Sequence, residues 1–152
     1  MAMAEKHKAR LAAFVILERD GKILLARRAN TGYADGMYQM PSGHVEAGEL
    51  PHEAAIREAK EEVGVDIDPR NLSFAHACYR INLVDDVGDY VDFFFRTSVW
   101  SGEPENREPE KCDELLWVSA DALPEATVAP VKAVLAHIRE GRQFSEVRQS
   151  TL

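Results

Sequence analysis

Three glutamates lie close together in one predicted helix, residues 51–63: Glu58, Glu61 and Glu62. A helix turns by about 100° per residue, so their carboxylates fall within roughly one quadrant of its surface. The opposite side is apolar, which predicts an amphipathic helix docked on a sheet. Carboxylates this close repel one another unless a cation neutralises them, and Mg²⁺ and Mn²⁺ prefer oxygen ligands. The spacing therefore indicates a candidate site for a hard metal ion.

Basic residues on the same helix offer a second way to balance this charge. Arg57 and Lys60 lie beside the glutamates in the sequence. A solvated helix face with many ion pairs is the usual explanation for such a charge-rich segment. The choice between the two interpretations depends on the residues around the helix.

The wider spacing favours the metal site. Residues 43–65, GHVEAGELPHEAAIREAKEEVGV, carry every fixed residue of the Nudix box, Gly-x5-Glu-x7-Arg-Glu-U-x-Glu-Glu-x-Gly-U, where U is usually a bulky aliphatic residue. Only Ala59, at the first U, is smaller than usual. A match at so many defined positions is improbable by chance. The chain therefore resembles the Nudix hydrolases, on a box that covers about one seventh of the sequence.

The resemblance implies roles for the acidic residues. Glu58 and Glu62 would bind Mg²⁺ or Mn²⁺ directly, and Glu61 would be a further ligand or act through water. The backbone carbonyl of Ser42 would be another ligand. Nudix enzymes differ in the residue that takes the proton from the attacking water, so Glu58 and Glu108 are both candidates for the general base.

Other residues of the box are expected to support this site. Arg57 would hold Glu49 or Glu58 in place. Gly43 and Gly64 complete the structural positions of the box. The usual Gly-Gly opening is Ser-Gly here, and serine disfavours a backbone conformation that only glycine adopts easily.

Two arginines at the end of the second predicted strand are candidates for binding substrate phosphates. Arg27 and Arg28 match a place where MutT-like proteins use an arginine, whose forked donors suit phosphate. Alternation along a strand predicts that only one of them points at the site, and a solvent-facing charge pair is the alternative.

The base subsite is less clear from the sequence. Residues 126–130, ATVAP, hold no amide or carboxylate where MutT-type enzymes read an oxidised purine, which puts that specificity in doubt. His44 is expected to be a surface residue, and the aromatic side chains that could stack a base are expected more often in the core or at the rim: Tyr33, Tyr38, Tyr79, Phe93, Phe95 and Trp117. We expect a nucleoside triphosphate as substrate, with a nucleotide sugar as second choice.

The elements that must position these residues alternate along the chain. Asp20-Gly21 predicts a hairpin between its two flanking strands, Pro51 suits the start of the central helix, and Gly64 its end. Strands are predicted at residues 10–19, 22–28, 72–83, 90–100 and 115–118, and a second helix at 131–138. The order alone does not fix a topology. The resemblance implies the Nudix fold, a mixed β-sheet between helices in an α/β/α sandwich.

Length and composition predict a single domain, which the resemblance identifies as a Nudix domain over residues 1–141. The tail, residues 142–152, is expected to be weakly ordered at most or available for exchange with a partner. The two cysteines, Cys78 and Cys112, are expected to be reduced and to have no special role. The sequence has no signal core and no apolar stretch long enough for a membrane span, so a cytoplasmic location without a membrane partner is the default.

The formal net charge of −8 argues against nucleic acid as a partner, because duplex binding depends on basic residues. A small phosphorylated nucleotide remains compatible if metal ions bridge the negative charges. A homodimer is slightly favoured. The main alternative is a catalytically inactive Nudix-fold module that senses a nucleotide. An isomerase acting on isopentenyl diphosphate would need a catalytic cysteine, and neither cysteine lies in a recognisable motif.

Overall fold

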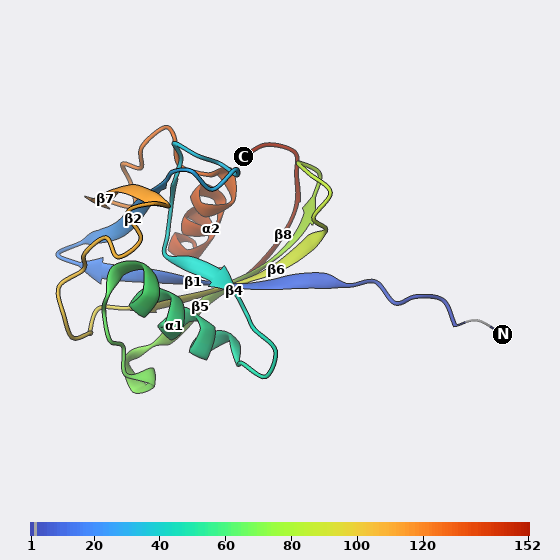
Figure 1. The fold of residues 1–152 in the computed structure, drawn as a ribbon, viewed down its shortest axis with the longest axis horizontal. Coiled ribbons are helices and arrows are strands. Elements are labelled where there is room, and N and C mark those ends of the chain that lie inside the picture. Colours follow the sequence, from blue (N-terminus) through green and yellow to red (C-terminus); the bar gives the residue numbers. More distant parts are fainter. Residues whose placement is uncertain (2) are drawn as a thin grey trace.

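The computed structural model describes residue 1 and residues 3–152, and Figure 1 shows a mixed sheet with helices on both faces. The strands are β1 (Ala9–Arg19), β2 (Lys22–Arg28), β3 (Tyr38–Gln39), β4 (Ser42–His44), β5 (Ser73–Asn82), β6 (Asp89–Thr97), β7 (Cys112–Val118) and β8 (Phe144–Gln149). The helices are α1 (Pro51–Val63) and α2 (Ala129–Arg139), with a short 3₁₀ helix η1 (Pro69–Asn71).

The sheet has the strand order β3-β2-β1-β6-β5-β8, with β4 paired to β1 and β7 paired to β2. The predicted hairpin of β1 and β2 is confirmed, since these strands pair antiparallel around the turn at Asp20-Gly21. The central pair, β1 and β6, is parallel along nine residues of β1, and β5 pairs antiparallel with β6. This arrangement places β4, which begins the Nudix box, beside the middle of the sheet.

Strand β1 separates two hydrophobic cores. Its even-numbered residues from Ala12 to Ile16 pack in a cluster with three buried residues of α2, and its odd-numbered residues from Ala13 to Leu17 pack in a cluster with α1. Side chains alternate across a strand, so a strand buried on both faces is apolar throughout. The predicted α/β/α sandwich is confirmed.

Helix α1 begins and ends where the sequence predicts. Pro51 is its first residue, and the capping residue Leu50 donates its backbone N–H to the carboxylate of Glu53 at 2.9 Å. Gly64 ends the helix in the left-handed conformation, with φ of 75°, and donates its N–H to the carbonyl of Lys60 at 3.0 Å. These caps fix where the helix begins and ends, and its buried residues Ala55, Ala59 and Val63 pack against the sheet.

The expectation of a weakly ordered tail is wrong. Residues 144–149 form β8, which pairs in parallel with β5 along its whole length and buries Gln149. The polar composition of this segment hid the strand, because its order comes from pairing with a sheet edge. The boundary of the domain at residue 141 stays a prediction. None of the helices in the described residues is long and apolar enough to cross a membrane.

Candidate active site

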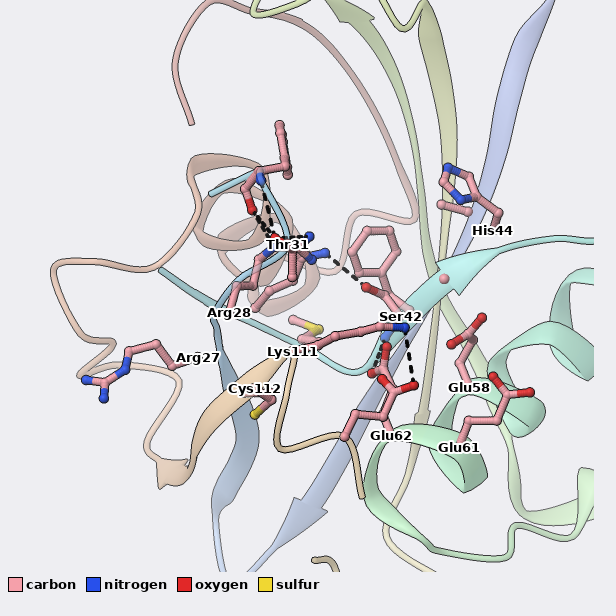
Figure 2. Close-up of a pocket in the computed structure, with 18 of the residues that line it drawn as sticks. Arg27, Arg28, Thr31, Ser42, His44, Glu58, Glu61, Glu62, Lys111 and Cys112 are labelled. Carbon is pink, nitrogen blue, oxygen red and sulfur yellow. Dashed lines mark hydrogen bonds and ion pairs between the residues drawn. The ribbon is translucent and has the colours of Figure 1, made fainter. Parts of the chain in front are cut away.

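A cleft of about 780 Å³ is formed by β1, β2, β4, α1, the β5–β6 hairpin and the loop before β7. Figure 2 shows the glutamates of α1 on one side of this cleft and the end of β2 on the other. The cleft brings together most residues that the sequence predicts for the site: Arg27, Arg28, Ser42, Gly43, Arg57, Glu58, Glu61, Glu62 and Glu108.

The acidic residues of α1 differ in their surroundings. Burial raises the pKa of Glu62 well above its ordinary value, and the charge of Glu58 adds to this effect. Burial also raises the pKa of Glu58, although Arg57 acts in the opposite direction. Glu61 is half exposed at the mouth of the cleft. Glu58 and Glu62 are both desolvated, and both lie near the charge of Glu108. A bound cation would therefore stabilise their ionised forms.

Arg57 holds the acidic residues together. Its Nε donates to Glu49 at 2.8 Å, and its Nη1 donates to Glu58 at 2.7 Å and to Glu61 at 3.3 Å. Its Nη2 donates to Glu49 at 3.0 Å and to the carbonyl of His44, also at 3.0 Å, which ties α1 to the end of β4. This hydrogen bonding lowers the pKa of Glu49 and raises that of Arg57. A lysine has only a point charge and could not make this set of bonds.

Gly43 makes room for Glu58. A Cβ atom added at Gly43 would lie 1.9 Å from Oε1 of Glu58, inside the carboxylate's own volume. The φ of Gly43 lies outside the left-handed region. The glycine is therefore required by the close approach of β4 to the helix side chains, and not by its backbone conformation.

Ser42 adopts its conformation without strain. The positive-φ residues other than glycine in the described chain are Asp20, Asn30 and Ala34, so the concern about serine at this position does not hold. Its backbone N–H donates to Glu62 at 3.0 Å, which orients that carboxylate in the cleft. The role of its carbonyl as a metal ligand stays a prediction.

The loop between β6 and β7 brings Glu108 to the cleft. Backbone N–H groups of Glu105 and Arg107 donate to the carbonyls of Val63 and Glu62, both at 3.0 Å, and so anchor the loop to the end of α1. The acidic residues near Glu108 in the sequence do not line the cleft: Glu105, Glu110, Asp113 and Glu114. The fold thus separates Glu108 from neighbours that the sequence alone does not distinguish.

Both candidate arginines line the cleft but have different partners. Arg27 donates to Asp113 at 2.7 Å, and Figure 2 shows its side chain directed away from the glutamates. Arg28 donates to the carbonyl of Tyr33 at 2.7 Å and to Thr31 at 3.1 Å, and its charge acts on Glu62. Arg28 is therefore the better placed of the two for a phosphate near α1.

The donor set fits a divalent cation. Glu58, Glu61 and Glu62 each use only one carboxylate oxygen in hydrogen bonds among the described residues, so each keeps a second oxygen for a ligand. Hard oxygen donors at high negative charge density suit Mg²⁺ or Mn²⁺. Over residues 1 and 3–152, however, no group of three acidic, histidine or cysteine side chains is already drawn together tightly enough to form a metal cage.

The cleft also contains residues that sequence reasoning missed. His44 is exposed, as expected, but it also lines the cleft and stacks on Tyr90 with ring centroids 5.9 Å apart. Arg80 and Lys111 line it as well. Arg80 and Lys111 lie outside the box in the sequence, and the fold brings them to it: Arg80 is on β5, which pairs with β6 next to β1, and Lys111 is in the loop before β7. The segment ATVAP does not line the cleft, and its Thr127 and Val128 are buried.

Comparison with known proteins identifies the class to which this fold and site belong. The family model described as NUDIX domain matches residues 7–137. This covers most of the sequence, so the chain belongs to the Nudix hydrolase family. A crystal structure of a MutT Nudix hydrolase from Burkholderia pseudomallei superposes with a TM-score of 0.77 and 25% identity, covering 86% of this chain and 98% of that one.

Curated relatives give the subgroup. The 8-oxo-dGTP diphosphatase of Escherichia coli (strain K12) is 29% identical over 133 residues, 86% of this chain and 98% of that protein. The Haemophilus influenzae protein of the same name is 30% identical over 134 residues, 88% of this chain and 92% of that protein. A third one, from Proteus vulgaris, is 34% identical over 65 residues, 58% of its length. Within the family, the chain is a MutT-like Nudix hydrolase.

Proposed function

We propose that this protein is a metal-dependent pyrophosphohydrolase that cleaves a phosphoanhydride bond in a nucleoside diphosphate linked to another group, with nucleoside triphosphates as the first choice. The observation that carries the proposal is the set of desolvated glutamates on α1, which line one cleft with arginine and lysine side chains. The family generally uses divalent metals such as Mg²⁺, and its members act on small nucleotide substrates.

The protein's own residues supply binding and orientation. Glu58 and Glu62 would hold the metal, with Glu61 and the Ser42 carbonyl as further ligands. The bound metal would screen the phosphate charge and lower the pKa of the attacking water. Arg57 keeps Glu58 in place through its 2.7 Å bond.

The remaining groups of the cleft would act on the substrate and the water. Arg28 and Lys111 offer donors to phosphate oxygens. The general base is Glu58 or Glu108. Glu108 sits 3.7 Å from Lys111, an ion pair that a phosphate would disturb on binding.

The substrate is proposed as a nucleoside triphosphate because the full-length relatives bear the name of a triphosphate-cleaving enzyme. A nucleotide sugar is the second choice. Shorter matches, over 50 and 51 residues, are to proteins named ADP-ribose pyrophosphatase and CTP pyrophosphohydrolase, so similar proteins differ in substrate.

The test combines substrate screening with two glutamate variants. Nucleoside triphosphates, nucleotide sugars and ADP-ribose are incubated with Mg²⁺ or Mn²⁺, and released phosphate or pyrophosphate is measured. Glu58→Gln and Glu62→Gln should each lower kcat/KM by at least about 100-fold, because loss of even an outer-shell metal partner costs ~10–100-fold. Binding of Mn²⁺, followed by its electron paramagnetic resonance signal, should weaken in parallel.

A matched control comes from the same helix. Glu53 does not line the cleft, and glutamine keeps the acceptor for the capping bond from Leu50, so Glu53→Gln should retain activity. Activity of Glu62→Gln at the level of the unchanged protein would refute the metal assignment. Tight nucleotide binding without turnover of any substrate would instead favour the sensing module.

A further inference from the structure

A buried charged network lies at the end of the cleft that β5 and β6 form. Arg80 on β5 donates from Nε to Asp92 at 2.8 Å and from Nη2 to the same carboxylate at 3.3 Å. Its Nη1 donates to the side-chain carbonyl of Gln149 on β8 at 2.7 Å. The side chains of Arg80 and Asp92 are only 9% and 1% exposed, so solvent contributes little to holding this arrangement.

Arg80 and Asp92 form an ion pair with no net charge, and Arg80 keeps N–H groups that no described residue accepts. A guanidinium has five N–H groups, and within the part of the chain that the structure describes three of them donate to Asp92 and Gln149. One N–H therefore remains on each terminal nitrogen of Arg80. Asp92 balances the charge of Arg80, which makes the pair a weak attractor for phosphate. What remains is a pair of hydrogen-bond donors at the wall of the cleft.

Aromatic rings surround this end of the cleft. The guanidinium carbon of Arg80 lies 4.3 Å from the centre of the Tyr90 ring, which also stacks with His44. Tyr33 lines the same region. Figure 2 shows His44 on the far side of Ser42 from the end of β2. Flat aromatic and imidazole surfaces next to paired donors suit a nucleobase, which offers a ring to stack and an edge to read.

Strand β8 positions Arg80. The strand begins after residue 137, where the match to the family model ends, so it is an addition to the matched region. Its parallel pairing with β5 sets Gln149 next to Asn82 and brings the Gln149 amide to Arg80. Gln149 is buried and its amide nitrogen donates to the carbonyl of Thr151 at 2.8 Å, which fixes the direction of the amide oxygen.

We infer that Arg80 reads the edge of a guanine base in this cleft and that β8, through Gln149, is the element that orients it. Two donors match two adjacent acceptors, and guanine presents O6 and N7, whereas adenine presents N7 beside an amino donor. In 8-oxoguanine N7 carries a hydrogen, so that base also mismatches. This inference rests on the proposed function, since it assigns the base that the nucleotide substrate would carry.

The test measures binding of nucleoside monophosphates by calorimetry, without metal and without turnover. GMP should bind roughly 5- to 150-fold more tightly than AMP, the range for one bidentate arginine contact, and 8-oxo-GMP should bind like AMP. Equal affinity for GMP and AMP would overturn the inference, and so would equal affinity for GMP and 8-oxo-GMP. Failure of hydrolysis with the GMP preference intact would count against the proposed function alone.

Variants of Arg80 and Gln149 distinguish recognition of the base from a purely structural role of these residues. Arg80→Lys keeps a cation for Asp92 but loses the fork, so the preference for GMP should fall toward one. Gln149→Met removes the acceptor for Arg80 together with the donor to Thr151, and it should lower the preference several-fold. Gln149→Glu also lacks that donor but retains the acceptor, so it should keep the preference and thereby assign the effect to the acceptor. Unfolding midpoints are measured for each variant. A Gln149→Met protein with unchanged GMP preference would show that β8 has no role in orienting Arg80.

Discussion

Gly43 sets the position of the carboxylate that the proposed reaction needs most. The side chain of Glu58 occupies the space in which any other residue at position 43 would place its Cβ, 1.9 Å from Oε1. Arg57 holds the same carboxylate from the other side at 2.7 Å. The Glu58 carboxylate thus packs against the backbone of β4 and is hydrogen-bonded to Arg57.

Gly43→Ala should therefore affect activity more than stability. The clash involves the end of a flexible side chain, and the backbone at position 43 is not in the left-handed region, so the unfolding midpoint should change little. The Glu58 carboxylate must move, and a misplacement of about 1 Å can cost up to ~100-fold in rate. Steady-state kinetics and thermal unfolding measure the two effects. A large loss of stability with kinetics unchanged would contradict this explanation.

Residues close in sequence were the predictable part of the site. Glu58, Glu61 and Glu62 share one helix, so their common face follows from helix geometry. Arg80 and His44 depend on how β1, β4, β5 and β6 pair, and local sequence does not determine such pairing. Glu108 is intermediate, since the resemblance singled it out, but only the fold shows that it lines the cleft while the acidic residues close to it in the sequence do not.

At the scale of elements, the junction between α1 and the loop before β7 controls two parts of the site. Gly64 ends α1 with φ of 75°, and the Nε of Arg107 lies 2.6 Å from the position of an added Cβ. The loop that holds Arg107 also holds Glu108 in the cleft. The end of the helix and the loop are therefore packed as one unit, and disturbing one displaces the other.

Gly64→Ala should lower both stability and activity, and Gly21→Ala provides the matched control. Both glycines have positive φ, 75° and 73°, so alanine should cost about 1–2 kcal/mol at either position. An added Cβ at Gly21 meets nothing within 4 Å, whereas at Gly64 it meets Arg107. Urea unfolding should show the larger loss for Gly64→Ala, and only that variant should lose activity, by about tenfold. Equal effects in the two variants would rule out a special role for this junction.

The helices and strands that could be predicted from the sequence are those whose ends are marked by residues close together in the chain. Helix α1 carries its own caps, and the β1–β2 turn carries Asp20-Gly21, so both follow from residues close in the chain. Strand β8 has no such signal. Its residues are mostly exposed, and its order comes from pairing with β5, in which each paired residue has its partner 67 positions later in the chain. Sequence patterning detects buried faces and turns, and it does not detect an edge strand of this kind.

At the scale of the whole molecule, two histidines join the elements on the α2 side of the sheet. His76 on β5 is fully buried, donates from Nδ1 to the carbonyl of Arg142 at 2.8 Å, and hydrogen-bonds at Nε2 with the hydroxyl of Ser145 at 2.7 Å. Its ring stacks on His137 of α2, with centroids 5.7 Å apart. The contact connects β5, α2 and β8, and through β8 it reaches Gln149.

Acid should weaken the fold at this contact. Burial lowers the pKa of His76, and the neighbouring His137 adds to the effect. An unfolded histidine takes up a proton near pH 6.5, whereas folded His76 resists protonation until lower pH. Between these two values the unfolded state binds more protons, so the free energy of unfolding falls as pH drops below about 6.5, by up to about 1.4 kcal/mol per pH unit. The loss should level off below the folded pKa.

The variant His76→Gln isolates this effect from other titrating groups. Glutamine cannot take up the proton, so urea unfolding at pH 7, 6 and 5 should show a shallower decline for this variant than for the unchanged protein, even if its stability at pH 7 is lower. His52→Gln, on α1 and outside this contact, serves as the control and should keep the original pH dependence. An identical decline in His76→Gln and the unchanged protein would mean that the acid sensitivity arises elsewhere.

Strand β8 pairs with β5 next to His76, so a weakening confined to this side of the sheet should release β8 first. Amide hydrogen exchange at pH 5 should therefore be faster in residues 144–149 than in α1.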